Sequence, residues 1–141
     1  MMISFKGQIS IEYLVVLGFV TFLVISVLGL SLVYIDSVRD TIKFRQTEAY
    51  ATKVVRAAES VYYAGQPSKV HVQAYVPVSV SKIEVLREGL LITVTASSGE
   101  AKTLFSSAVP LNSSSGTLPA SEGLKDIELS ASADSVVVSS S

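Results

Sequence analysis

The sequence predicts an α+β protein in which a long N-terminal helix is followed by a small antiparallel β-sheet or sandwich. Residues 13–35 form a run of 23 residues without a formal charge, which as a helix would span about 35 Å. From Lys69 onward the apolar residues recur at every second position, which is the period of strands. The 141 residues provide one small globular domain beside such a helix.

The first half of the predicted helix, residues 13–35, suits lipid better than water. Its many β-branched residues would disfavour a helix in water. In lipid, however, a single span can satisfy its backbone hydrogen bonds only as a helix. The small residues Gly18, Ser26 and Gly29 would let a neighbouring helix approach closely, or they reflect ordinary membrane-helix composition.

The helical pattern continues after the charges return at Asp36. Apolar residues recur at spacings of three and four, first at Ile35, Val38 and Ile42, then at Tyr50, Val54, Ala57, Ala58 and Val61. We expect this half to be amphipathic, with its apolar face on the β domain.

Charged pairs and a stop signal complete the helix. We expect opposite-charge pairs at i,i+3 for Asp36–Arg39 and Asp40–Lys43. Gly65, followed by Pro67, is a stop signal. The whole helix is therefore expected over residues 8–65.

Residues 66–141 are predicted to form the antiparallel β domain, with six short strands. We place these near residues 70–76, 83–86, 90–94, 102–105, 125–131 and 135–138. The turn-rich segment 110–123 contains Asn112-Ser113-Ser114, an N-glycosylation sequon that suits an exposed loop of a secreted protein. Four tyrosines are expected to pack between helix and sheet: Tyr50, Tyr62, Tyr63 and Tyr75.

The composition offers no positive case for catalysis, a cofactor or a metal. The net charge of −1 does not favour nucleic acid as a partner. There is no cysteine, and His71, the single histidine, is expected to face solvent on a strand. The acids of the β domain are expected to form a solvated face, with a calcium site as the alternative: Glu84, Glu88, Asp126, Glu128 and Asp134. No phosphate-binding loop, nucleophile elbow or carboxylate pair is present, so we expect no enzyme.

One carboxylate, Glu12, stands at the edge of the apolar run. A charge among apolar helices is unfavourable without a partner, which makes Glu12 a candidate functional residue. Cleavage between Gly7 and Gln8 would create an α-amine four residues away, about 6 Å along the helix axis. The alternative is that Glu12 lies among lipid headgroups.

The N-terminus is read in two ways. Residues 1–7 precede the apolar run, which is too long for an ordinary secretory signal, so a simple signal anchor is one interpretation. The other is a leader, residues 1–7, that is removed before Gln8. The residues Lys6-Gly7-Gln8-Ile9-Ser10-Ile11-Glu12-Tyr13 resemble the class III signal peptide of archaeal type IV pilin-like proteins.

That resemblance implies cleavage by a prepilin peptidase and a role in assembly for Glu12. It places Glu12 at the fifth position of the mature chain, where type IV pilins carry a glutamate that helps set subunit register. It also implies a structural filament subunit that waits in the cell membrane and is then assembled outside the cell, where adhesion would be its role. The implied partners are copies of itself, an assembly ATPase and a membrane platform protein.

Other functions remain open from the sequence. The chain could be a single-pass membrane-anchored extracellular β domain that never polymerises. It could also be a minor pilin or pseudopilin. An archaellin is a weaker match, because Gln8 and the early Glu12 depart from archaellin-type starts.

Overall fold

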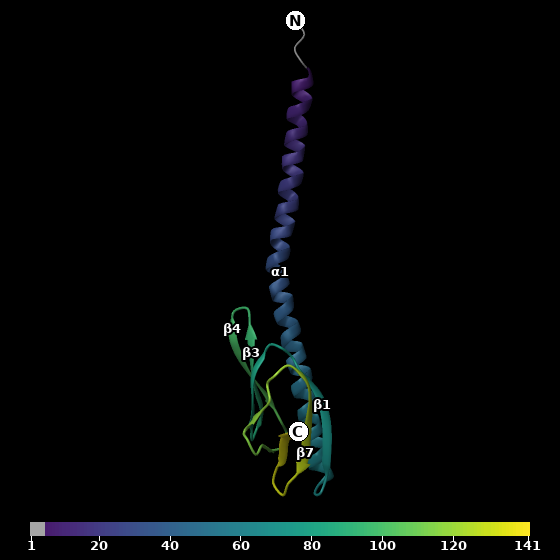
Figure 1. The fold of residues 1–141 in the computed structure, drawn as a ribbon, viewed down its shortest axis with the longest axis vertical. Coiled ribbons are helices and arrows are strands. Elements are labelled where there is room, and N and C mark those ends of the chain that lie inside the picture. Colours follow the sequence, from purple (N-terminus) through teal and green to yellow (C-terminus); the bar gives the residue numbers. More distant parts are fainter. Residues whose placement is uncertain (1–4) are drawn as a thin grey trace. The chain divides into compact units, whose positions relative to one another are not determined.

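The computed structural model describes residues 5–141, and the surroundings of side chains from Ile9 onward. It confirms the α+β prediction: one long helix, α1 (Phe5–Ala64), precedes eight strands (Figure 1). The helix begins before the predicted start at residue 8, because no turn signal separates Phe5 from the apolar run. Residues 1–4 of the predicted leader lie outside the described residues. The chain divides into two compact units, residues 1–39 and 40–141.

The strands of the second unit form two four-stranded sheets. Their bounds are β1 (Lys69–Val76), β2 (Val80–Leu86), β3 (Gly89–Ala96), β4 (Gly99–Ser106), β5 (Leu111–Asn112), β6 (Thr117–Leu118), β7 (Gly123–Ala131) and β8 (Val136–Ser140). The strand orders are β1-β7-β8-β5 and β4-β3-β2-β6. All pairs are antiparallel except β5 and β8, which are parallel.

The six predicted strands are all present. Two further strands are present in the segment 110–123, which the sequence predicts to be rich in turns. These two, β5 and β6, have two residues each. A two-residue strand shows no alternation, so no periodic signal marked it. Its place comes from pairing with β8 or β2 rather than from its own sequence.

One apolar core joins both sheets to the part of α1 that lies in the second unit. The helix contributes Tyr50, Ala51, Val54, Val55, Ala58 and Val61, all buried. The sheets contribute their inward positions, among them Ile83, Leu90, Ile92, Ile127, Leu129, Val136 and Val138. This confirms the second predicted stripe, from Tyr50 to Val61, whereas the first stripe is exposed at Ile35, Val38 and Ile42 and that part of the prediction is wrong. Burial raises the pKa of Tyr50 to about 12.

Gly65 ends the helix as predicted. Its φ of 76° lies in the left-handed region that glycine adopts without a Cβ clash. Its N–H donates to the carbonyls of Val61 and Tyr62 at 3.2 and 3.1 Å, which satisfies acceptors that a helix end leaves open.

Two of the four tyrosines do not pack as predicted. Tyr63 is 74% exposed because it follows the partly buried Tyr62 by one residue, about 100° around the helix. Tyr75 is exposed because the buried residues of β1 have the opposite parity, and its hydroxyl donates to Glu122 at 2.9 Å.

Of the two expected ion pairs in the helix, one forms. Lys43 Nζ lies 3.4 Å from Asp40 Oδ1. No ion pair links Asp36 to Arg39 among the described residues, and both side chains are exposed, where such a pair stabilises little. The expectation for Asp36–Arg39 is therefore wrong.

Gly89, at the start of β3, lies against the backbone of β4. A Cβ built there would come within 2.1 Å of the Phe105 carbonyl oxygen, and the φ of 155° already disfavours other residues. Gly99 has a φ of 128° but no atom within 4 Å of such a Cβ.

Gly89→Ala should therefore destabilise the protein more than Gly99→Ala. We expect the conformational cost of about 1–3 kcal/mol in both variants. Only Gly89→Ala should add about 1–3 kcal/mol for displacing the neighbouring strand. Chemical denaturation of the full chain in detergent measures both, and equal losses would contradict the contact at Gly89.

Candidate functional site

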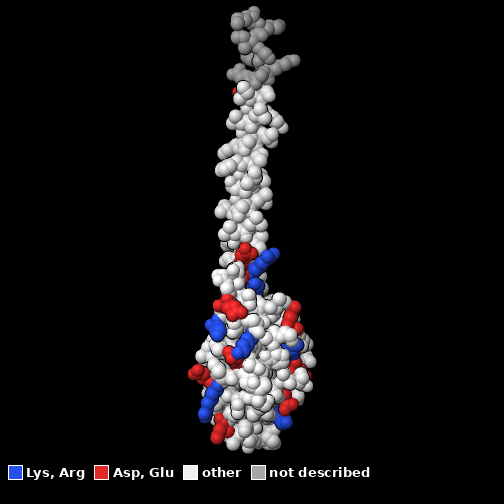
Figure 2. All heavy atoms as spheres, turned by 60° about the vertical axis from the view of Figure 1, so that its left-hand side comes forward, with Lys and Arg blue, Asp and Glu red and all other residues white. Residues whose placement is uncertain are grey.

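The candidate site is the uncharged part of α1, residues 13–35, together with Glu12 at its edge. The helix is long and apolar enough to cross a membrane, with a mean hydropathy of 2.6 over its most apolar stretch. None of that stretch is buried within the structure. Figure 2 shows a long stretch of helix as white spheres, without Lys, Arg, Asp or Glu.

Exposing this segment to water would be strongly unfavourable. It contains 16 Val, Leu, Ile and Phe residues, and Leu30 and Val33 are 73% and 76% exposed. Each such side chain gains about 1.5–3 kcal/mol on full burial, so the segment as a whole forgoes tens of kcal/mol in water. It therefore needs cover from lipid or from other protein chains.

Two hydroxyl groups inside the segment, those of Thr21 and Ser26, are satisfied by the helix itself. Thr21 Oγ1 donates to the carbonyl of Leu17 at 2.7 Å, and Ser26 Oγ donates to the carbonyl of Phe22 at 2.8 Å. These i−4 bonds give the hydroxyl hydrogens of both residues an acceptor in an apolar environment. Both residues thus fit lipid as well as a packed helix bundle.

Two tyrosines bracket the segment, a feature that the sequence reasoning missed. Tyr13 and Tyr34 are 67% and 71% exposed and lie 21 residues apart on one helix. That separation is about 32 Å, close to the thickness of a hydrocarbon layer of about 30 Å. Tyrosine is enriched at both membrane–water interfaces, and the signal was its position at the two ends of the run.

Glu12 is exposed at the edge of this segment. It forms no ion pair or side-chain hydrogen bond with any other residue in the range 9–141. Any counter-charge for Glu12 inside an apolar environment must therefore come from residues before Ile9 or from another molecule. The backbone of Gly7 and Gln8 belongs to α1, whereas their side chains lie outside the described part.

Gly18 and Gly29 are open positions on the helix surface. A Cβ at either would meet nothing within 4 Å in this chain. The close approach expected at these glycines involves a second helix, so it stays a prediction.

His71 faces solvent, as predicted, on the outer side of β1. Its Nδ1 lies 3.8 Å from Asp126 Oδ1 and its Nε2 lies 3.6 Å from Glu128 Oε2, both on β7. Lys69 Nζ also lies 3.2 Å from Glu128 Oε1. The two ring nitrogens face different carboxylates, so these side chains form a row of polar contacts on the surface and not a shared set of metal ligands.

The five acids of the β domain do not converge on one point. Asp126 and Glu128 lie on β7 and Glu84 lies on β2, whereas Glu88 and Asp134 lie in turns. A hydrogen bond from Lys82 holds the pKa of Glu84 below its ordinary value. Within the described part of the chain, no group of three His, Asp or Glu residues could hold a metal ion.

Asn112 is exposed on β5, an edge strand of its sheet. Its Oδ1 accepts a hydrogen bond from the N–H of Ser113 at 2.8 Å. A shallow pocket beside it is lined by Val85, Arg87, Leu111, Asn112, Asp134 and Ser135. The predicted sequon thus lies at an accessible edge, and glycan attachment stays a prediction.

A scan against protein-family models, a search of curated proteins and a search of solved structures found no match to this chain. The apolar segment and Glu12 are therefore the features of the chain that bear on its function.

Two lysines in the middle of the segment should prevent membrane insertion. Leu23→Lys with Val27→Lys should raise the insertion free energy by about 5–7 kcal/mol, because each lysine costs about 2.5–3.5 kcal/mol at a helix centre. The measurement is the carbonate-resistant membrane fraction of the expressed chain. Leu23→Val with Val27→Leu is the control, and unchanged membrane retention of the lysine variant would contradict a spanning role.

Proposed function

We propose that this chain is a structural subunit of a type IV pilus-like filament of the archaeal kind that residues 6–13 resemble. The observation that supports this most is the apolar segment 13–35, which is exposed along its length and is not covered by any other part of the chain that the structure describes. In the precursor, lipid would cover it. In the filament, the same segment of other copies would cover it.

The polar start of the helix favours a filament over a plain anchor. An anchor needs only an apolar run of about 20 residues. It has no need of Glu12 at the edge of the run, nor of Lys6-Gly7-Gln8 before it. A carboxylate at that place suits a contact that forms only after cleavage and only between correctly placed chains.

Cleavage before Gln8 would supply the counter-charge that Glu12 otherwise lacks. The new α-amine would lie about 6 Å along the axis from Glu12 in the same chain. In an axially offset neighbour the amine can face Glu12 directly, and the ion pair then fixes the offset between the chains. An offset of another size would leave both charges unpaired in an apolar core, which is strongly unfavourable.

Assembly requires work, although the assembled filament is stable in water. Moving the segment from lipid into a helix bundle is nearly neutral in hydrophobic terms, since both surroundings are apolar. An assembly ATPase acting through a membrane platform protein would therefore drive extraction. Heterologous contacts that do not close into a ring then extend the polymer, with the β domains outside the cell and available for adhesion.

The second candidate is a single-pass, membrane-anchored extracellular β domain. The spacing of Tyr13 and Tyr34 favours it, because two interfacial tyrosines suit a permanent span. A minor pilin or pseudopilin is a variant of the first candidate, distinguished by its low stoichiometry in purified fibres. Filaments that disappear when the gene is deleted would separate the filament from the anchor.

Gly7→Val should block removal of the leader, because a β-branched residue replaces the one residue without a side chain at the cleavage site. The isolated protein should then begin at its original N-terminus rather than at Gln8. Intact mass and N-terminal sequencing measure this, with Ser10→Ala as the control that should still be processed. Normal processing of Gly7→Val would contradict the assigned site.

Glu12→Ala should leave processing intact and strongly reduce the yield of filaments. The variant keeps the apolar segment and the new α-amine but removes the carboxylate that the amine would pair with. The measurement is the ratio of sheared filaments to membrane-bound subunit, with Glu48→Ala, an exposed glutamate farther along α1, as the control. A normal fibre yield for Glu12→Ala would count against the pairing.

A further inference from the structure

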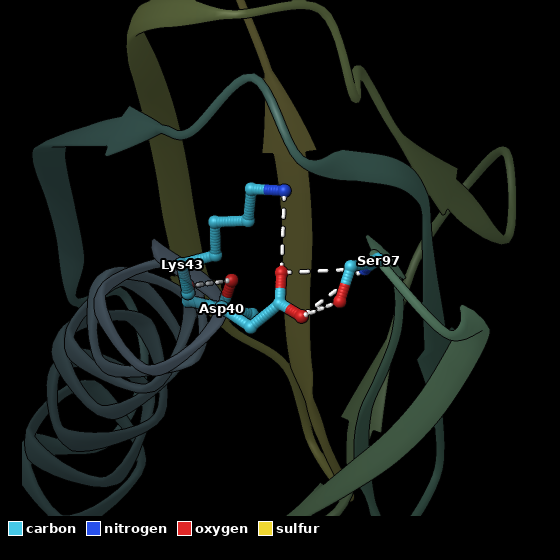
Figure 3. A network of polar contacts seen from close by, with 4 residues as sticks. Asp40, Lys43 and Ser97 are labelled. Atoms are coloured by element: carbon cyan, nitrogen blue, oxygen red, sulfur yellow. Dashed lines mark hydrogen bonds and ion pairs between the residues drawn. The ribbon is translucent and has the colours of Figure 1, made fainter. Parts of the chain in front are cut away.

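The tip of the β3–β4 hairpin is tied to α1 through one carboxylate, that of Asp40 (Figure 3). The N–H of Ser97 donates to Asp40 Oδ1 and Oδ2 at 3.3 and 3.1 Å, and the Ser97 hydroxyl donates to Oδ2. Lys43 Nζ, one helical turn on, donates to Oδ1 at 3.4 Å. Three donors thus converge on a carboxylate that is only 18% exposed.

Little else holds the tip in place. β4 is the outer strand of its sheet and pairs only with β3. Residues 97–100 are exposed, and Val94 is the last fully buried residue of β3 before the turn. Beyond it, the N–H of Thr95 donates to the carbonyl of Ser79 at 2.7 Å. Because hydrophobic burial ends before the turn, the bonds to Asp40 supply much of the attachment of the tip.

The charge of Asp40 strengthens these bonds. The hydrogen bonds from Ser97, and then the contact with Lys43, hold the pKa of Asp40 below its ordinary value. Lys43 is the charged partner from the helix, and the hairpin contributes the uncharged Ser97. Among the described residues no ion pair reaches Asp40 from Lys102 on β4, and Glu100 on the same strand carries the same charge as Asp40.

We propose that Asp40 is a latch for the hairpin: its carboxylate holds the tip against α1, and the tip opens as a unit when the carboxylate is lost or neutralised. The unit comprises the paired residues Thr95–Glu100 and Ala96–Gly99 and the turn between them, whereas Val94 is fully buried and stays closed. The rest of the hairpin stays closed, because Leu90 and Ile92 are fully buried. The latch thus determines whether the start of the β4 edge is ordered.

Hydrogen exchange of the full-length protein in detergent, followed residue by residue, tests this latch. In Asp40→Asn and in Ser97→Ala, the amides of residues 95–100 should exchange roughly tenfold faster or more, since bonds to a charged group are lost. Exchange from Leu90 to Ile92 should not change. Asp36→Asn and Ser98→Ala are the matched controls, which remove a charge on the same helix and a hydroxyl in the same turn.

Acid should have the same effect as Asp40→Asn. Because the folded pKa of Asp40 is lowered, its contribution is complete above the ordinary aspartate value of about 4 and is lost as the pH falls through the lower folded value. After correction for intrinsic exchange rates, the tip of the wild type should open below that pH, whereas Asp40→Asn should show no such transition. The proposal is overturned if only the amide of Ser97 exchanges faster in the variants. It is also overturned if the amides of residues 95–100 exchange at the same rate in wild type and Asp40→Asn.

Discussion

The structure depends on one constraint: a helical segment of 23 uncharged residues has no apolar partner among the described residues 9–141. The backbone of this segment is satisfied by the helix, and so are the hydroxyls of Thr21 and Ser26. Its Val, Leu, Ile and Phe side chains, however, expose apolar surface that the described residues do not cover. That surface makes the segment stable in lipid or in a helix bundle and unstable in water, which limits the functions open to the chain.

The second half of the helix packs its apolar side chains against the β domain. From Thr47 to Val61 one face is buried in the core of the β domain, while the other faces carry charges. Polar bonds supplement this packing: Lys53 Nζ donates to the carbonyl of Gln73 at 2.5 Å, and Glu59 Oε1 accepts from the N–H of Ala108 at 3.3 Å. This part of the helix therefore belongs to the core of the β domain.

Most of the fold could be predicted from the sequence because its signals are local. Hydrophobic periodicity located the helix and six strands, and Gly65 located the helix end. The short strands β5 and β6 could not be found, because they exist only through partners far along the chain. The contact between Asp40 and Ser97 spans 57 residues and was missed for the same reason.

The candidate site was predicted in part. Glu12 and the apolar run were evident, since one charge beside 23 uncharged residues is visible without a structure. Tyr13 and Tyr34 are uncharged and belong to the apolar run, so a count of charges does not distinguish them from their neighbours. No side chain in the range 9–141 neutralises Glu12, so the sequence of this range does not predict its partner.

The position of β8 has a consequence for how the domain is made. β8 lies between β7 and β5 in its sheet and buries Val136 and Val138, although it is the last strand to be synthesised. Until residue 140 has emerged, β5 has no neighbour in that sheet and β7 has an open edge. The sheet can therefore close only after β8 has been synthesised, because the earlier strands cannot complete it by themselves.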